Sequence, residues 1–394
     1  MTGRLLSFIL ICASLMFDGG RAPDTQAIPQ SPPESRSHAQ EITRDRLVAA
    51  ARAGGDYLIR MQKPDGSFHY YYDPVEDRFS TRSYNILRHA GTALSLFDVY
   101  ARTRDARYLN AASAGVAFLK TRFRDARGSG AFYVLDNDGK AKLGANGLAL
   151  LALTRQAELD PKSADLAGAK RLADLIIALQ RKDGSFESYY RVRGDEPVAR
   201  VSLYYPGEAI FGLVRLYELT RERRLIESAR RGASFLIASQ RKAGALPPDA
   251  WLIQALEALY KVDPAASYAR HAIAIAHAMM ADQYLGTAPP EYRGGFGPGA
   301  PASTAAASRA EGMVAAYRLA RSTSDPSAER IAGSLRACVR FQLSQQYTAA
   351  NSLLLPNPGR AAGGFRQSAA TARIRIDFVQ HNVSSLLGAA DVLY

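Results

Sequence analysis

The stretch Gln62-Lys63-Pro64-Asp65-Gly66-Ser67-Phe68 returns as Gln180-Arg181-Lys182-Asp183-Gly184-Ser185-Phe186, and a weaker copy reads Gln240-Arg241-Lys242-Ala243-Gly244. Each copy follows an apolar stretch such as Tyr57-Leu58-Ile59, and Gln283 and Gln346 close two further stretches of the same kind. A marker that recurs about every sixty residues is typical of a fold built from one helical unit used many times.

Between these markers lies a class of strongly apolar helix. In residues 148–153, for example, leucine and alanine alternate on nearly every side, and a helix that is apolar all round is buried all round. Leu150 and Leu213 are therefore expected to be fully buried. Six such segments start with small or polar residues, near positions 88–91, 146–147, 206–208, 248–249, 309–312 and 380–382.

A second class of helix is amphipathic. Leu47, Ala51 and Leu58 share one helical face, with Asp45 and Arg52 on the other. Similar patterns run through residues 108–119, 166–179, 225–237, 268–280 and 331–341. Because the two classes alternate six times, residues 41–394 are predicted to form an all-α (α/α)6 toroid, in which six inner helices line a barrel and six outer helices wrap it.

The connections between these helices differ in length. Inner-to-outer turns are short, whereas outer-to-inner connections are long and rich in glycine and aromatic residues, as at 63–87, 123–145, 181–206 and 347–379. Long loops gathered at one face are where a ring of this kind is expected to carry its function. Residues 186–192 are expected to form a short β-hairpin.

The first residues are typical of an export signal. Arg4 precedes the apolar run 5–17, which is too short to span a bilayer, and small residues surround a cleavage point after Ala22. The sequence therefore predicts a signal peptide at 1–22, a flexible linker rich in Pro, Ser and Gln at 23–40, and a periplasmic or secreted protein. The alternative is that the signal is not cleaved and anchors the protein, and this segment would then be its only expected contact with a membrane. Cleavage leaves Cys338 as the single cysteine, so stability must come from the core.

The net charge of +13 favours anionic partners. Basic residues are spread over many helices without a long Lys/Arg run, which argues against nucleic acid and favours an acidic polysaccharide or a lipid headgroup. A basic surface without a special ligand is the alternative. No metal-ligand spacing stands out, so neither a metal nor another cofactor is predicted.

The repeats resemble those of terpene cyclases and protein prenyltransferases, which are also helical toroids. The signal, the long loops and the six inner-helix starts resemble the six-hairpin glycosidase-like superfamily, which holds glycoside hydrolases, sugar epimerases and some polysaccharide lyases. The Asp-x-Asp-Asp motif of the cyclases is absent, and Cys338 lies in an outer helix, away from where a prenyltransferase holds zinc. The repeat itself is interpreted as structural: the glutamine bonds to backbone, Asp-Gly makes a turn and the phenylalanine packs beneath.

A ring of this type brings the starts of its inner helices together around a central pit, with the positive ends of the helix dipoles facing it. Glu208, Asp249 and Glu311 are the candidate catalytic carboxylates, and His89 and His381 the candidate catalytic histidines. Helix capping is the alternative role for Asp249 and Glu208. The candidate substrate-binding residues are Arg88, Asn146, Tyr204, Tyr205, Trp251, Arg309, Gln380 and Asn382.

Three functions fit these residues. The first is an exported carbohydrate-active enzyme: two carboxylates would serve glycoside hydrolysis, and a His or Tyr facing an Arg or Asn would serve a uronate lyase or epimerase. Its partner is a polysaccharide or oligosaccharide, and the charge favours an acidic one. The second is a terpene-cyclase-like toroid that acts on a lipid and predicts a deep aromatic pit. The third is a non-catalytic glycan-binding or scaffold protein, whose polar residues are only helix caps.

Overall fold

The computed structural model describes residues 41–80, 84–192 and 202–394. The predicted signal peptide and linker lie outside the described residues. Six inner helices form a closed barrel, each in contact with the next around the ring: α2 (Ile86–Thr103), α4 (Leu143–Leu159), α6 (Tyr205–Thr220), α8 (Ala250–Val262), α10 (Ser303–Ser322) and α13 (Ile376–Val392). Leu150 and Leu213 are fully buried, as predicted.

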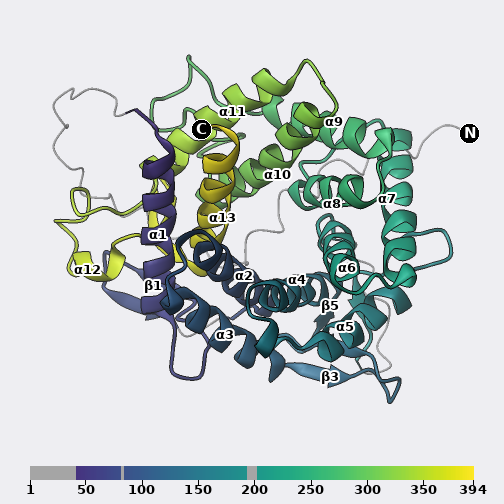
Figure 1. Cartoon of the computed structure of the whole chain (residues 1–394). Coiled ribbons are helices and arrows are strands. Elements are labelled where there is room, and N and C mark those ends of the chain that lie inside the picture. The colour runs from purple at the N-terminus through teal and green to yellow at the C-terminus, as the bar shows by residue number, and fades with distance from the viewer. Residues whose placement is uncertain (1–40, 81–83, 193–201) are drawn as a thin grey trace, which may run out of the picture. The chain divides into compact units, whose positions relative to one another are not determined.

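Six outer helices wrap this barrel: α1 (Arg44–Met61), α3 (Ala106–Lys120), α5 (Leu166–Ala178), α7 (Arg223–Ala243), α9 (Ala266–Ala281) and α11 (Ala328–Ser344). The outer helix α1 packs against the last helix, α13, so the two ends of the ring meet (Figure 1). The predicted (α/α)6 toroid of twelve main helices is confirmed, with the single turn α12 (Pro358–Ala361) and the 3₁₀ turn Pro161–Ser163 as additions within the described residues.

Two inner helices begin earlier than the sequence suggested. Helix α10 begins at Ser303 and not near Arg309, and α13 begins at Ile376 and not near Gln380. Glu311 therefore lies in the third turn of α10, and His381 in the second turn of α13. Small residues open α10, and their low hydrophobicity hid its true start. Helix α13 follows directly on strand β8, which ends at Arg375, so no turn residue marks its start.

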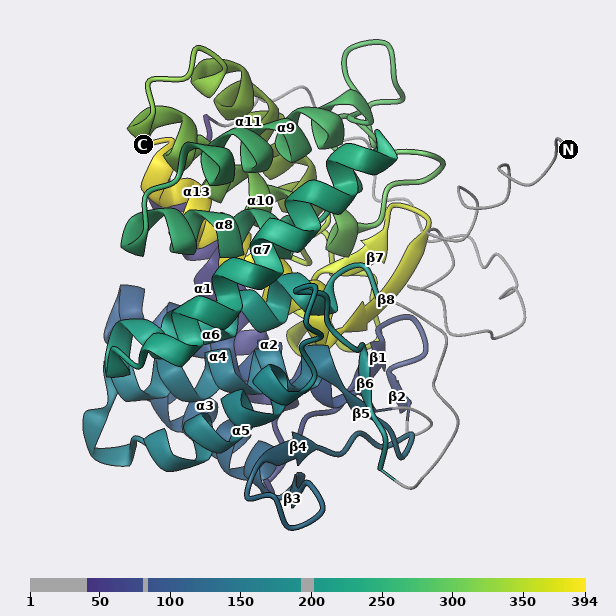
Figure 2. The ribbon, with the colours of Figure 1, turned by 90° about the vertical axis from the view of Figure 1, so that its right-hand side faces the viewer.

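The short strands lie in the outer-to-inner connections. The strands β1 (Tyr71–Asp73), β2 (Arg78–Ser80), β7 (Arg366–Ser368) and β8 (Thr371–Arg375) form an antiparallel sheet in the order β2-β1-β8-β7, and β3 (Phe123–Asp125) pairs with β4 (Phe132–Val134). The hairpin expected at 186–192 is wrong: β6 (Tyr189–Tyr190) pairs instead with β5 (Ala141–Lys142) from the preceding loop. We call the end of the ring that carries these loops the loop face, and the opposite end the short-turn face (Figure 2).

The repeated glutamines link neighbouring outer helices. The Gln180 amide, just after α5, donates to Gly184 O in its own loop (3.2 Å) and to Ser228 O on α7 (3.0 Å). Gln62, Gln283 and Gln346 make the same two kinds of bond, so that α1 is joined to α3, α9 to α11 and α11 to α1. At the end of α7, Gln240 bonds instead to His271 of α9 (2.8 Å).

The rest of the repeat shapes the loop that the glutamine holds. Asp183 accepts bonds from the Ser185 N–H (3.0 Å) and hydroxyl (2.7 Å), which closes the turn, and Phe186 is buried beneath it. Gly184 has φ +94°, and a Cβ there would stand 2.5 Å from Arg231 O on α7. Only glycine fits this conformation and this close approach. The structural interpretation of the repeat is confirmed.

Replacing Gln180 by Leu keeps most of its volume but leaves the buried carbonyls of Gly184 and Ser228 without this donor. We expect a loss of about 1–3 kcal/mol in the free energy of unfolding, measured by denaturant titration. Lys182→Leu, in the same loop at an exposed position, is the control and should change stability by less than about 0.5 kcal/mol. Equal effects of the two substitutions would show that the glutamine does not hold the ring.

Candidate functional site

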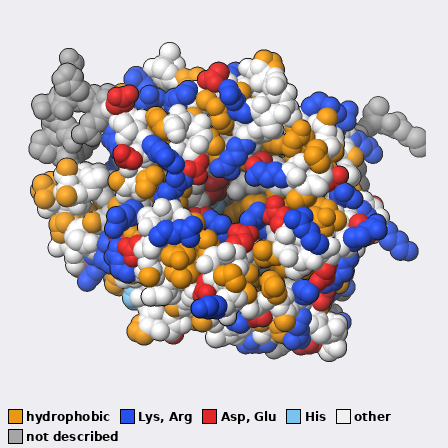
Figure 3. Space-filling model, viewed as in Figure 1, with side chains coloured by type: hydrophobic (Ala, Val, Ile, Leu, Met, Phe, Trp, Pro, Cys, Tyr) orange, Lys and Arg blue, Asp and Glu red, His pale blue; other side chains and the backbone are white. Residues whose placement is uncertain are grey.

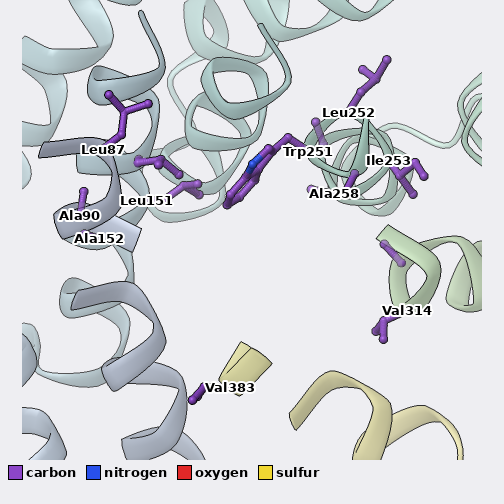
Figure 4. Packing of buried hydrophobic residues seen from close by; sticks show 14 of the residues in the cluster. Leu87, Ala90, Leu151, Ala152, Trp251, Leu252, Ile253, Ala258, Val314 and Val383 are labelled. Atoms are coloured by element: carbon purple, nitrogen blue, oxygen red, sulfur yellow. The ribbon is translucent and has the colours of Figure 1, made fainter. Parts of the chain in front are cut away.

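A cavity of about 190 Å³ lies on the axis of the barrel. All six inner helices contribute to its wall, and Trp251 of α8 reaches into the space they surround (Figure 4). The lining mixes apolar side chains with many polar ones: Gly91, Leu94, Asp98, Leu151, Thr154, Arg155, Phe211, Arg215, Trp251, Gln254, Glu311, Gln380, His381 and Ser384.

A second, wider cavity of about 480 Å³ adjoins the first and shares with it lining residues such as Asp98, Arg155 and Glu311. It also reaches Arg102, Arg318 and Asp391, which lie in or near the last turns of α2, α10 and α13. The last turns of the inner helices lie at the short-turn face. Figure 3, seen from that face, shows a hollow at the centre of the ring with acidic and basic side chains around it.

A histidine–carboxylate pair faces the axial cavity. His381 Nδ1 lies 2.9 Å from Glu311 Oε2, and the two side chains are 13% and 9% exposed. Burial by itself would lower the pKa of His381, but the charge and hydrogen bond of Glu311, with a smaller contribution from Asp377, together outweigh burial and raise it. Burial raises the pKa of Glu311, and His381 offsets only part of that shift. The Trp251 ring stands edge-on to the imidazole, with 6.1 Å between centroids.

This arrangement leaves His381 Nε2 as the ring nitrogen that can meet a ligand, because Nδ1 is engaged by Glu311. A carboxylate on Nδ1 fixes the tautomer and stabilises the imidazolium that forms when Nε2 takes a proton. The pair is therefore built to act as a general base and acid at the cavity wall.

Glu208 and Asp249, by contrast, line neither cavity. Both are buried, with Glu208 packed against Gly144 of α4 and Asp249 capping α8 through the Leu252 N–H (3.0 Å). Glu208 Oε2 and Asp249 Oδ2 have no hydrogen-bond partner among the described residues. Of the three candidate carboxylates, Glu311 alone lines the two cavities on the barrel axis, and a role for Glu208 and Asp249 in a shared site stays a prediction.

Burial raises the pKa of both carboxyl groups, because one oxygen of each has no hydrogen-bond partner to stabilise the charged form. Burial raises the pKa of Glu208 to about 8, with a further contribution from Asp249, and burial raises the pKa of Asp249 to about 7 despite its backbone bonds. Neutral carboxyls at these positions cost less than buried charges.

Several other candidates hold the fold together. Fully buried His89 bonds to Tyr84 Oη (2.6 Å) and Gly115 O (2.7 Å), and burial lowers its pKa to about 4. The Asn146 amide clamps strand β4, donating to Phe132 O (2.8 Å) and accepting from Val134 N (3.0 Å). Neither residue lines the axial cavity.

Gln380 does line the axial cavity, and it accepts a bond from Thr92 Oγ1 (2.8 Å). Asn382 is buried and bonds to Phe378 O (2.7 Å). The Arg309 guanidinium lies 4.8 Å from the centre of the Phe296 ring. Arg309 lines neither cavity, and neither do Tyr204 and Tyr205 at the start of α6.

Arg88 belongs to a buried ionic cluster at the loop face. Its Nε lies 3.0 Å from Asp377 Oδ2, and Arg375 binds the same carboxylate through NH2 (2.8 Å) and also donates to Tyr71 Oη (2.6 Å). Burial would raise the pKa of Asp377, but the two guanidiniums lower it. The cluster ties the sheet to the starts of α2 and α13, close behind His381.

Sequence reasoning missed six polar residues of the axial cavity: Asp98, Thr154, Arg155, Arg215, Gln254 and Ser384. They lie beyond the first turns of the inner helices, whereas the candidates named from the sequence lie near the predicted helix starts. A polar residue inside an otherwise apolar helix was the sequence pattern that could have identified them. Within the described residues, no group of three His, Cys, Asp or Glu side chains is arranged to hold a metal ion.

Neither a protein-family model nor a curated protein matches the chain. Solved structures match well. The cellobiose 2-epimerase from Bacillus thermoamylovorans B4167 aligns with a TM-score of 0.65 at 13% identity over 88% of this chain and 99% of that one. An unsaturated glucuronyl hydrolase specific for heparin aligns with a TM-score of 0.63 at 13% identity, over 88% of this chain and 98% of that one. The GH76A α-1,6-mannanase from Salegentibacter sp. HEL1_6 aligns with a TM-score of 0.61 at 15% identity, over 88% of this chain and 100% of that one.

The fold is that of the six-hairpin (α/α)6 toroids. At these identities the likeness concerns the fold and leaves the reaction to be argued from the cavity.

The raised pKa of Glu208 yields a test of its burial. Between the ordinary value of 4.5 and about 8, the folded chain holds a proton that the unfolded chain has lost, so stability falls as the pH rises through this window. Glu208→Gln should therefore raise the melting temperature by a few degrees above pH 8 and change it little near pH 4.5. Glu329→Gln, at an exposed first-turn position of α11, is the control and should not stabilise the protein. A Glu208→Gln variant that is destabilised at alkaline pH would contradict the assignment.

Proposed function

We propose that this chain is an exported carbohydrate-active enzyme that moves a proton at a sugar carbon, as an epimerase or a lyase does. The observation that carries the proposal is the His381–Glu311 pair on the wall of the axial cavity (2.9 Å). A carbon next to a carbonyl or carboxylate group loses its proton to a positioned base, and His381 Nε2 is that base here. Arg155 and Arg215 line the same cavity and supply N–H donors for an oxygen that becomes negative.

The character of the cavity supports a sugar over a lipid. The lipid hypothesis requires a deep aromatic pit, whereas Trp251 and Phe211 share this wall with two arginines, two amides and two carboxylates. A tryptophan next to such hydrogen-bonding groups is the usual composition of a carbohydrate site. The scaffold hypothesis predicts polar side chains bonded only to local backbone, and the side-chain pair of His381 and Glu311 is not of that kind.

The fold neighbours support the same substrate class. An epimerase and an unsaturated glucuronyl hydrolase are among the proteins that share this toroid, and an inactive variant of the mannanase was solved in complex with α-1,6-mannotriose. The net charge of +13 favours a sugar that carries acidic groups.

Hydrolysis is the second candidate, because Glu311 and Asp98 both line the axial cavity and burial raises the pKa of both. Glycoside hydrolysis uses two such carboxyl groups, one as the acid. Asp98, however, is bonded to Arg155 (3.1 Å), and Glu311 to His381. Both carboxyls are thus committed to cationic partners, which favours the proton-transfer chemistry.

Substitution of the pair separates the two reactions. His381→Asn should reduce turnover by about 10²–10⁴-fold. It should also abolish the incorporation of deuterium from D₂O into the sugar carbon, followed by NMR. Glu311→Gln should move the acid limb of the pH–rate profile to lower pH, because the pKa of His381 falls once the carboxylate is gone. His277→Asn, on the outer helix α9, is the control. Loss of glycoside cleavage in Asp98→Asn, with full activity in His381→Asn, would establish hydrolysis instead.

Export is part of the proposal and rests on the sequence of residues 1–22. Among the described helices, none combines the length and the apolar character needed to cross a membrane. We expect the mature chain to begin at Pro23-Asp24-Thr25 and to be recovered outside the cytoplasm, as checked by N-terminal sequencing of fractionated cells. A protein that keeps Met1 and fractionates with the cytoplasm would refute export.

A further inference from the structure

The two cavities of the barrel form one passage to the short-turn face. They share six lining residues: Asp98, Arg155, Phe211, Gln254, Glu311 and Ser384. Beyond these, the wider cavity follows α13 through Leu387, Gly388 and Asp391, and α10 through Val314 and Arg318. The passage therefore runs from His381 to the hollow seen in Figure 3.

The depth of the passage follows from helix geometry. Glu311 and Arg318 are seven residues apart on α10, which is two turns and about 10 Å along the axis. Both line the wider cavity, Glu311 at its inner end and Arg318 at the mouth. A ligand that touches His381 and extends outward thus passes Arg318.

Resting on the proposed function, we infer that the substrate reaches His381 through the short-turn face, and that Arg318 binds an acidic group of the substrate about 10 Å from the reacting carbon. The entrance therefore lies at the end of the ring opposite the long loops.

The charges at the mouth single out Arg318. Arg102 is paired with Asp391, Arg155 with Asp98, and the Glu257 carboxylate with Lys261. Among the described residues Arg318 has no ion pair, and its side chain is exposed. The mouth thus carries one uncompensated guanidinium, a group that binds carboxylate through two parallel hydrogen bonds.

The ends of the inner helices weaken this attraction without cancelling it. Their carbonyl ends give the short-turn face a partial negative charge, which disfavours an anion. The arginines of the mouth lie within or close to the last turns and offset that charge. The paired groups are neutral together, so the charge of Arg318 remains.

The size of the passage limits the substrate. The inner cavity of about 190 Å³ has the volume of about six water molecules, enough for one sugar ring. The wider part accommodates a second unit. The structure therefore points to a short acidic oligosaccharide, or the end of an acidic chain, with its carboxylate on the unit next to the reacting sugar.

Access can be measured without any substrate. In Ser384→Cys, the new thiol lines both cavities, and a small methanethiosulfonate should label it, as read by peptide mass spectrometry. The native Cys338 is fully buried, and burial raises the pKa of its thiol to about 12, so it should not be labelled. Adding Ala101→Trp at the mouth should slow labelling at least tenfold. Lys162→Trp, on an exposed inner-to-outer turn, should not.

A second form of the block avoids any folding defect. In Ala101→Cys, a polyethylene-glycol maleimide attached after folding should close the mouth and abolish turnover. The same label on Lys162→Cys should have no effect. Unchanged turnover with the labelled Ala101→Cys, or unchanged labelling of Ser384→Cys behind Ala101→Trp, would refute entry from this face.

The role of Arg318 is tested with a uronic-acid-terminated disaccharide and its neutral counterpart. Arg318→Gln should lower the ratio of kcat/KM for the acidic to the neutral substrate about tenfold, mainly through KM. Arg321→Gln, three residues further on at an exposed position, is the control. An unchanged ratio would refute the acidic subsite. A fully active His381→Asn variant would refute the proposed function as well. An inactive His381→Asn variant, with mouth variants that behave as wild type, would refute only the inference about entry.

Discussion

The ring depends on one interaction, the bond from a glutamine side chain to the next outer helix. A toroid has no sheet to hold its outer layer together, and each outer helix contacts its neighbours far less than it contacts the barrel. The amides of Gln62, Gln180, Gln283 and Gln346 supply that lateral link and also fix the loop that follows. Because buried carbonyls must find donors, each link also satisfies groups that the loop would otherwise leave unpaired.

The same interaction explains why the fold could be predicted from the sequence. A link that reaches two specific carbonyls needs the same glutamine, glycine and phenylalanine each time, so the repeat stays visible when the helices around it have diverged. After α3 the corresponding position is Thr121, whose N–H and hydroxyl bond to the last turn of its own helix, and the marker is lost there. The starts of α10 and α13 were misjudged because neither helix has a side-chain N-cap that marks its first residue.

The candidate site was less predictable, because ring geometry decides which turn of an inner helix faces a cavity. The first turns come very close together, with Gly144 and Gly147 against Glu208, and Gly207 against Leu252. Side chains there are enclosed between helices, which buries Glu208 and Asp249. Further along the helices, larger residues such as Phe211 and Arg155 hold the helices apart, together with Trp251 from the first turn of α8, and the cavity forms. Position in the first turn was visible in the sequence, but the spacing between helices was not.

The polar axis of the barrel is itself informative. Asp98, Arg155, Glu158, Arg215 and Glu218 form a continuous chain of ion pairs across three inner helices. Buried and half-buried ion pairs add little stability, because desolvation offsets most of their attraction, and an apolar filling of equal volume would serve the fold as well or better. The space around Trp251 is bordered by this network and by His381 with Glu311, and not by leucine and valine alone. A ring that keeps hydrogen-bonding groups where packing would favour hydrocarbon is better suited to hold a polar ligand than to stabilise itself.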